Sequence, residues 1–186
     1  MNLPTSFSSR LRAASVGLVL AVVTILYGQG MGIVFGLNED AIKDRLKTSA
    51  AGVRDTVYKA DDAAIKAVQD KSWAYMQRAH LHAGGMGTTA LVLIVLVCLL
   101  EPSRRVTAII GVGLGGGGLG YSVFWMWAGF RAPALGGTGA AKESLKWLAM
   151  PSSGAFVLAT AAVLFVLIAA FVSRRPSSAA KTSEAG

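Results

Sequence analysis

Four long stretches without Asp, Glu, Lys or Arg constrain this chain more than any other feature. They cover residues 13–37, 83–100, 106–130 and 147–172. About 20 apolar residues in a helix cross the ~30 Å hydrocarbon layer of a bilayer, and each stretch is close to that length or longer. Only 15% of the residues are charged, against about 25% in soluble domains. We therefore expect an all-α membrane protein, an antiparallel four-transmembrane-helix bundle with a helical extracytoplasmic loop.

The order of the expected segments follows from these stretches. We expect transmembrane helices at 13–37, 80–101, 106–130 and 147–172, extracytoplasmic loops at 38–79 (helical and amphipathic) and 131–146, and disordered polar cytoplasmic tails at 1–12 and 173–186. The first helix resembles a secretory signal, but its 25 uncharged residues exceed the roughly 7–15 of a signal's apolar core. We expect it to be retained as a transmembrane helix.

The distribution of positive charge predicts the orientation in the membrane. The net charge is +8, and basic residues precede the first helix, separate the second from the third and follow the fourth. These residues are Arg10, Arg12, Arg104, Arg105, Arg174, Arg175 and Lys181. The positive-inside rule makes their side cytoplasmic, so both termini are expected there, in a bacterial inner membrane. The excess charge indicates topology and contact with the lipid bilayer. Its distribution at the helix ends argues against nucleic acid as a partner.

The 38–79 loop has apolar residues at close to helical spacing. Asn38, followed by two acidic residues, resembles a helix start, and Gly52 and the pair Asp61-Asp62 are possible breaks. One long helix or two shorter ones fit this pattern. The segment is expected to form a cap over the bundle or a docking surface for a partner such as an electron-transfer protein.

Two glycine clusters lie inside the expected membrane helices. The run 111–120 contains G-x-G-x-x-G, but a dinucleotide site needs a preceding strand, so we interpret the run as close helix packing. Its G-x-x-x-G pairs are Gly111/Gly115, Gly113/Gly117 and Gly116/Gly120. The second cluster is Gly28, Gly30, Gly32 and Gly36. Tight packing explains it, or both clusters line a space for a flat ligand such as a porphyrin, in which the Gln29 amide finds a hydrogen-bond partner.

The two histidines of the chain, His80 and His82, lie where a charged segment enters the second apolar stretch. Two residues correspond to roughly 200° around a helix, so their side chains are expected to point in nearly opposite directions and not to ligate one haem together. His82 lies deeper and is the preferred axial ligand, with His80 and Arg78 as partners for haem propionates. Hydrogen-bonding roles alone, proton chemistry, or a Zn or Cu site completed by Asp70 or Glu143 are the alternatives.

A six-coordinate haem would need a further ligand. Met31, Met126 and Met150 are expected at a depth compatible with His82. A five-coordinate iron, or ligation across a homodimer, are the other possibilities. Cys98, the only cysteine, lies in mid-helix and is expected to act as a small buried hydrophobe.

The motif Ala79-His80-Leu81-His82, followed by Gly87, resembles the start of a transmembrane helix in small four-helix membrane proteins related to haem-copper oxidase subunit I. The resemblance implies b-type haem at His82 or His80 and a redox or haem-sensing role. Four expected helices and no further histidine exclude a complete oxygen or nitric-oxide reductase.

We therefore expect a haem-b-binding membrane protein, not a complete enzyme alone. It would serve as an electron-transfer or haem-dependent accessory subunit, in a larger respiratory or other membrane complex or as a homodimer. The competing class is a cofactor-free structural or assembly subunit. A small transporter is disfavoured, because the apolar stretches contain no charged side chain.

Overall fold

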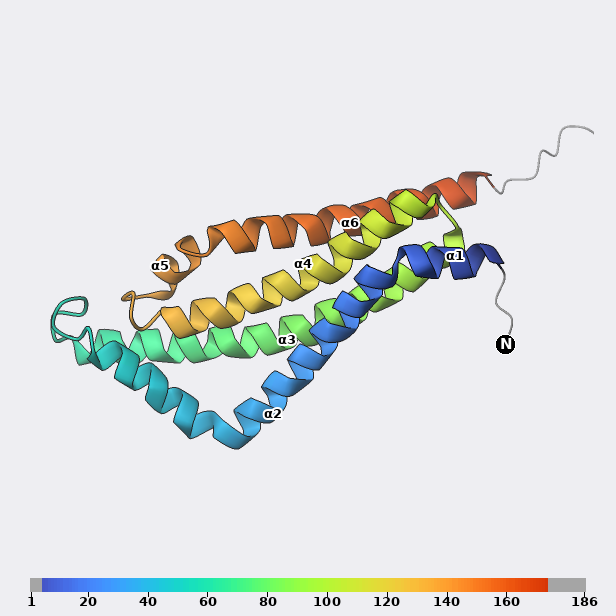
Figure 1. Cartoon of the computed structure of the whole chain (residues 1–186). Helices are drawn as coiled ribbons and strands as arrows, with labels where there is room; N and C mark the ends of the chain where they lie inside the picture. Colours follow the sequence, from blue (N-terminus) through green and yellow to red (C-terminus); the bar gives the residue numbers. More distant parts are fainter. Residues whose placement is uncertain (1–4, 174–186) are drawn as a thin grey trace, which may run out of the picture.

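The computed structural model of the chain describes residues 5–173, and over this range it contains helices joined by turns and short irregular connections, without a strand. The helices are α1 (Thr5–Ala13), α2 (Ser15–Ala51), α3 (Asp62–Leu100), α4 (Arg104–Arg131), α5 (Thr138–Glu143) and α6 (Lys146–Ser173). Four of them, α2, α3, α4 and α6, are long and apolar enough to cross a membrane (Figure 1). The prediction of an all-α protein with four membrane helices is confirmed.

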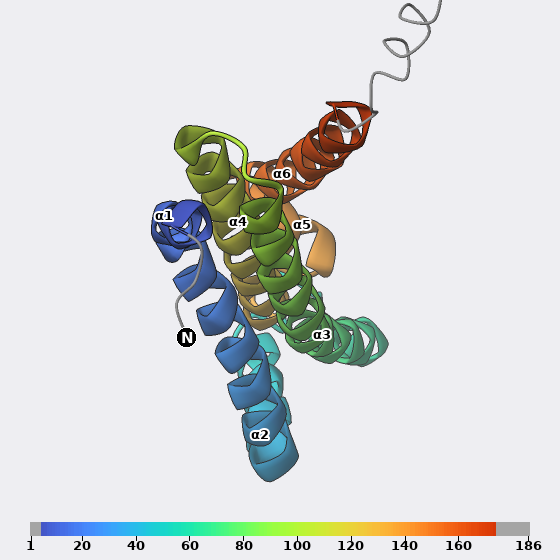
Figure 2. The same ribbon diagram turned by 90° about the vertical axis from the view of Figure 1, so that its right-hand side faces the viewer.

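Helix α4 occupies the centre of the bundle. It packs against α2, α3 and α6, whereas α6 contacts α4 far more than α3 and does not contact α2. Viewed from the end of the bundle that carries both ends of the described chain, α2 and α6 lie on opposite sides of α4 (Figure 2). A core of buried side chains from α3 and α4 fills this end, among them Ile94, Val97, Cys98 and Leu114. Cys98 is thus buried among apolar residues, as predicted.

The glycines of α4 meet a different neighbour on each face of the helix. A methyl group added at Gly117 would lie 2.7 Å from the carbonyl oxygen of Ser152 in α6. One added at Gly115 would lie 2.9 Å from Cβ of Leu20 in α2. Close packing, the effect expected of small residues in membrane helices, is therefore confirmed for this cluster.

The pairs behave differently from one another. Gly111 and Gly115 both face α2, and Gly113 and Gly117 both face α6. Gly116 and Gly120 do not act as a pair, because a Cβ at Gly116 approaches α2 while one at Gly120 approaches α6. The idea that this cluster makes room for a flat ligand is wrong, because neighbouring helices already fill the space.

Helices α2 and α3 both continue beyond the membrane. At ~1.5 Å per residue, the 39 residues of α3 span about 58 Å, nearly twice the hydrocarbon thickness. Helix α2 bends at Asn38, whose φ of −133° and ψ of 25° are not helical. We call this bend the elbow. Beyond it α2 returns toward the beginning of α3 (Figure 1). A second helical segment therefore begins after Asn38, as the sequence predicted, although it follows the first segment without a loop.

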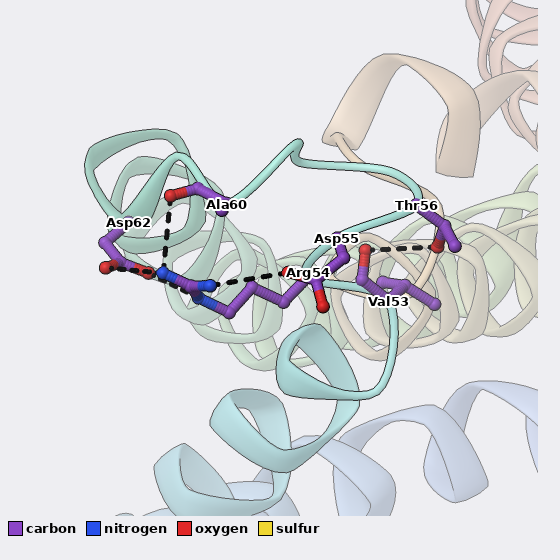
Figure 3. Close-up of polar contacts among 6 residues, drawn as sticks. All are labelled: Val53, Arg54, Asp55, Thr56, Ala60 and Asp62. Atoms are coloured by element: carbon purple, nitrogen blue, oxygen red, sulfur yellow. Dashed lines mark hydrogen bonds and ion pairs between the residues drawn. The ribbon is translucent and has the colours of Figure 1, made fainter.

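The connection 52–61 joins the two arms of this hairpin. Arg54 forms a two-bonded ion pair with Asp62, Nε to Oδ1 at 2.9 Å and Nη2 to Oδ2 at 3.0 Å (Figure 3). This pair lowers the pKa of the Asp62 carboxyl, chiefly through the Arg54 hydrogen bonds. The Tyr58 hydroxyl donates to the carbonyl of Pro133 at 2.7 Å, a buried contact. The connection is therefore fastened both to its own hairpin and to the α4–α5 turn.

Two segments expected to be irregular contain helices. Residues 5–13, part of the expected disordered tail, form α1, whose Phe7 and Leu11 lie one turn apart and pack on the core. Burying this apolar pair explains why the segment is ordered. The expected loop 131–146 contains α5, with Ala141 fully buried. The expected tail at 174–186 lies outside the described residues.

Candidate functional site

His80 faces α2 and is held by that helix's backbone. Its Nδ1 lies 2.7 Å from the carbonyl oxygen of Gly28. A carbonyl oxygen can only accept, so Nδ1 carries the proton and Nε2 keeps its lone pair. A Cβ at Gly32 would lie 2.9 Å from Cε1 of the ring. Glycine at this position is what admits the imidazole against the helix.

A groove between the elbow and α3 borders the His80 ring. It has a volume of about 450 Å³. Its lining residues are Gly32, Phe35, Gly36, Glu39, Trp73, Gln77, His80 and Leu81. The Phe35 ring lies 5.2 Å from that of Trp73 and 6.4 Å from that of His80, centroid to centroid. Within residues 5–173 the Nε2 atom of His80 has no hydrogen-bond partner. We call this space the His80 groove.

A second cavity of about 380 Å³ lies on the α4 side of the elbow and is almost wholly apolar. It is lined by Tyr27, Gly30, Met31, Val34, Phe35, Ile42, Met126 and Phe130. Phe35 lines both spaces. Two of the methionines considered as haem ligands, Met31 and Met126, therefore border this cavity and not the His80 groove.

His82 faces α4, on the other side of α3. Its ring centroid lies 5.3 Å from that of Tyr121 and 5.7 Å from that of Trp125. The predicted opposite directions of the two histidines are therefore confirmed. Arg78 stacks over the Trp125 ring at 5.4 Å, so it lies with the aromatic cluster around His82. His82 does not line either of the two spaces at the elbow.

Several residues considered from the sequence lie elsewhere. Gln29 is exposed and borders neither space, so the structure does not give it the interior role expected of it. Met150 is 67% exposed on α6. Asp70 pairs with Lys66, and Glu143 with Lys146. Across residues 5–173 no three His, Cys, Asp or Glu side chains gather as a metal site, so the Zn or Cu alternative lacks its extra ligands.

The aromatic residues divide into two groups that the sequence did not separate. Trp127 and Trp147 are exposed and pack edge to face at 6.1 Å, as expected of anchors at the headgroup level. Tyr121 and Trp125 differ from this pair, because they are half-buried against His82. Phe35 and Trp73 form walls of the His80 groove, a role that the sequence did not indicate. The change from apolar to charged residues at Asn38 was the one sequence signal of the bend that brings them together.

Charge at the mouth of the His80 groove is compensated. Glu39, a lining residue, forms an ion pair with Lys43, and their hydrogen bond raises the pKa of the Lys43 ammonium group. The same ammonium lies 5.4 Å from the centre of the Trp73 ring. A cation is thus fixed beside an aromatic wall of the groove.

Comparisons with protein-family models, with curated proteins and with solved structures find no match for this chain. The conclusions about its site therefore depend on its own geometry.

Proposed function

We propose that the protein binds b-type haem in the His80 groove and serves as an electron-transfer or haem-dependent accessory subunit of the bacterial inner membrane. The observation that carries the proposal is the setting of His80, whose Nδ1 donates to the Gly28 carbonyl while the ring borders the groove. Metal-ligating histidines almost always donate their other ring N–H in this way, which fixes the ring and makes the ligating nitrogen more basic. The proposed ligand is therefore His80 and not the deeper His82.

The residues around the groove suit a flat apolar ring. Gly32 and Gly36 present no side chain, and Phe35, Trp73 and Leu81 supply apolar walls. A Cβ at Gly36 would meet nothing within 4 Å, so the space there is open. Haem would supply one-electron chemistry, and the chain would supply a ligand, walls that limit water, and orientation.

Of the groove's lining residues, His80 would be the ligand that the chain supplies to the haem iron. No methionine is among the residues that line the groove, since Met31 and Met126 border the second cavity. Any further ligand would come from a second copy of the chain or from a small molecule. Lys43, beside Trp73, is the nearest candidate among the groove's neighbours for a propionate.

A reduced-minus-oxidised visible spectrum of the detergent-purified full chain, expressed with ample haem, tests the proposal. The wild type should show a b-type α band that His80→Ala removes and His82→Ala retains. A flat wild-type spectrum would refute haem binding. Loss of the band in His82→Ala alone would identify His82 as the haem ligand.

Two glycines offer a matched pair of blocking variants. Gly36 borders the His80 groove and Gly30 the second cavity, and a Cβ at either position meets nothing within 4 Å. Gly36→Leu and Gly30→Leu should therefore both fold. We expect the α band to be lost in Gly36→Leu and kept in Gly30→Leu. The reverse result would place the ligand in the second cavity.

A cofactor-free structural or assembly subunit is the second candidate, and the outer face of α6 would be its contact with another membrane subunit. Packed mainly on α4, α6 leaves large apolar side chains exposed, among them Val157, Leu158, Leu164, Phe165 and Phe171. The His80–Gly28 bond would then act only as a link between α3 and α2. This candidate predicts a colourless protein that remains in a larger complex on native gels, with His82→Ala assembling like the wild type.

A further inference from the structure

Two cations from different helices meet at one buried aromatic ring, away from the His80 groove. The Arg78 guanidinium of α3 lies 5.2 Å, and the Lys142 ammonium of α5 6.0 Å, from the centre of the Tyr75 ring. Tyr75 is only 8% exposed and packs edge to face on Trp125 at 4.8 Å. The two aromatic rings form a fixed floor, whereas both cationic side chains are exposed.

Neither cation has a carboxylate partner within residues 5–173. Five other basic residues in this half of the molecule do have one: Lys43, Lys47, Arg54, Lys66 and Lys146. Glu143, the sequence neighbour of Lys142, is ion-paired with Lys146 at 2.6 Å. The positive charge around Tyr75 is therefore left uncompensated by the described chain.

The floor also contains donors without partners. The indole Nε1 of Trp125 is buried and has no hydrogen-bond partner among the described residues. The Tyr75 hydroxyl also has no partner within residues 5–173, but unlike the indole nitrogen it is not fully buried. Buried polar groups are normally satisfied by protein or by a bound molecule. An acceptor-rich anion is the complement to the two cations and to the unpartnered Tyr75 hydroxyl.

Position along the helices identifies the source of that anion. Arg78 lies five residues before the uncharged stretch that starts at residue 83, and Lys142 lies five residues before Trp147. Trp147 and its partner Trp127 are the exposed aromatic pair expected at the headgroup level. The two cations thus lie where the phosphates of membrane lipids lie.

We infer that Arg78 and Lys142 bind the phosphate of a membrane lipid, above the floor formed by Tyr75 and Trp125. The guanidinium can hold two phosphate oxygens at once, while the ammonium acts as a point charge. The inference does not depend on haem at His80, which faces the other side of α3.

Native mass spectrometry of the delipidated full chain with dioleoylphosphatidylglycerol tests this site. Dioleoylglycerol, which has the same chains and no phosphate, is the control ligand. We expect the phospholipid to bind more tightly than dioleoylglycerol, and Arg78→Gln and Lys142→Gln each to weaken it about fivefold. Arg78→Lys keeps the positive charge but loses the guanidinium group that can hold two oxygens at once, so it should weaken phospholipid binding less than Arg78→Gln.

Lys71→Gln is the matched control variant. Lys71 is exposed on α3, seven residues before Arg78, and has no ion pair within residues 5–173. Its loss should leave binding unchanged. Equal binding of dioleoylglycerol, wild-type binding by both Gln variants, or an equal loss in Lys71→Gln would overturn the inference. Inorganic phosphate is the last test. If it displaces the lipid and stabilises the protein equally well, free phosphate is the ligand and the lipid assignment is overturned.

Discussion

Adjacent glycines of α4 should respond oppositely to the same substitution. A Cβ at Gly117 would lie 2.7 Å from the Ser152 carbonyl oxygen and 2.8 Å from the Phe156 backbone nitrogen, both in α6. A Cβ at Gly116 would meet only the end of the Leu20 side chain, at 3.8 Å. Gly117→Ala must therefore separate two helix backbones, whereas Gly116→Ala makes an ordinary contact.

The magnitude follows from two terms. Replacing glycine by alanine inside a helix stabilises it by roughly 1 kcal/mol, and this term is common to both variants. Overpacking costs typically about 1–3 kcal/mol and applies to Gly117→Ala alone. Gly116→Ala should therefore be about 1 kcal/mol more stable than the wild type, and the two variants should differ by about 1–3 kcal/mol.

Reversible unfolding by SDS in mixed micelles, followed by tryptophan fluorescence, gives the free energies. Trp125 and Trp127 are on α4 itself and report on its packing. The reasoning is refuted if the two variants have equal unfolding free energies, or if Gly116→Ala is the less stable. Either result would mean that α4 and α6 are not in backbone contact at Gly117.

Three further predictions concern the hairpin and the groove. Tyr58→Phe removes a buried hydrogen bond and should lower the unfolding free energy by about 1 kcal/mol in the same SDS titration; an unchanged value would contradict the docked connection. Arg54 lowers the pKa of Asp62 in the folded protein. The ion pair therefore stabilises the connection fully above the ordinary Asp pKa of about 3.9, and this stabilisation is lost as the pH falls through the lowered pKa of the folded state. Protease resistance of the 52–61 connection should therefore drop at acid pH in the wild type, whereas Asp62→Asn should be cleaved readily at every pH. Gly32→Ala should displace the His80 ring, seen as a changed imidazole shift by NMR, whereas Gly36→Ala should not.

The membrane helices were predictable because lipid imposes a simple requirement. A stretch such as 106–130 contains no charge, and only a helix satisfies its backbone in hydrocarbon. The continuation of α2 and α3 outside the membrane was not predictable, because amphipathic periodicity does not show whether residues 38–79 start new helices or extend the membrane helices. The breaks at Gly52 and Asp61-Asp62 were foreseen from their residue types, and α3 does begin at Asp62 after an Asp61 cap.

The candidate site was predictable in part. Helical geometry alone separates His80 from His82, but no pattern shows which helix each one faces. That depends on packing, since His80 reaches Gly28 only because Gly32 carries no side chain. His82 is the deeper histidine, but the elbow opens space beside His80 instead. Whether haem occupies that space stays a prediction.

The elbow makes α2 and α3 together a triangular frame. One side is the stretch of α2 before Asn38, the second is the returning arm, and the third is α3 (Figure 1). The returning arm, residues 39–51, is about 20 Å long at ~1.5 Å per residue. A triangle with sides of fixed length cannot change its angles unless a corner opens. The Arg54–Asp62 pair that closes one corner, and the Tyr58 bond that fastens this corner to the α4–α5 turn, therefore support the angle at the elbow, although neither Arg54 nor Tyr58 lines the groove.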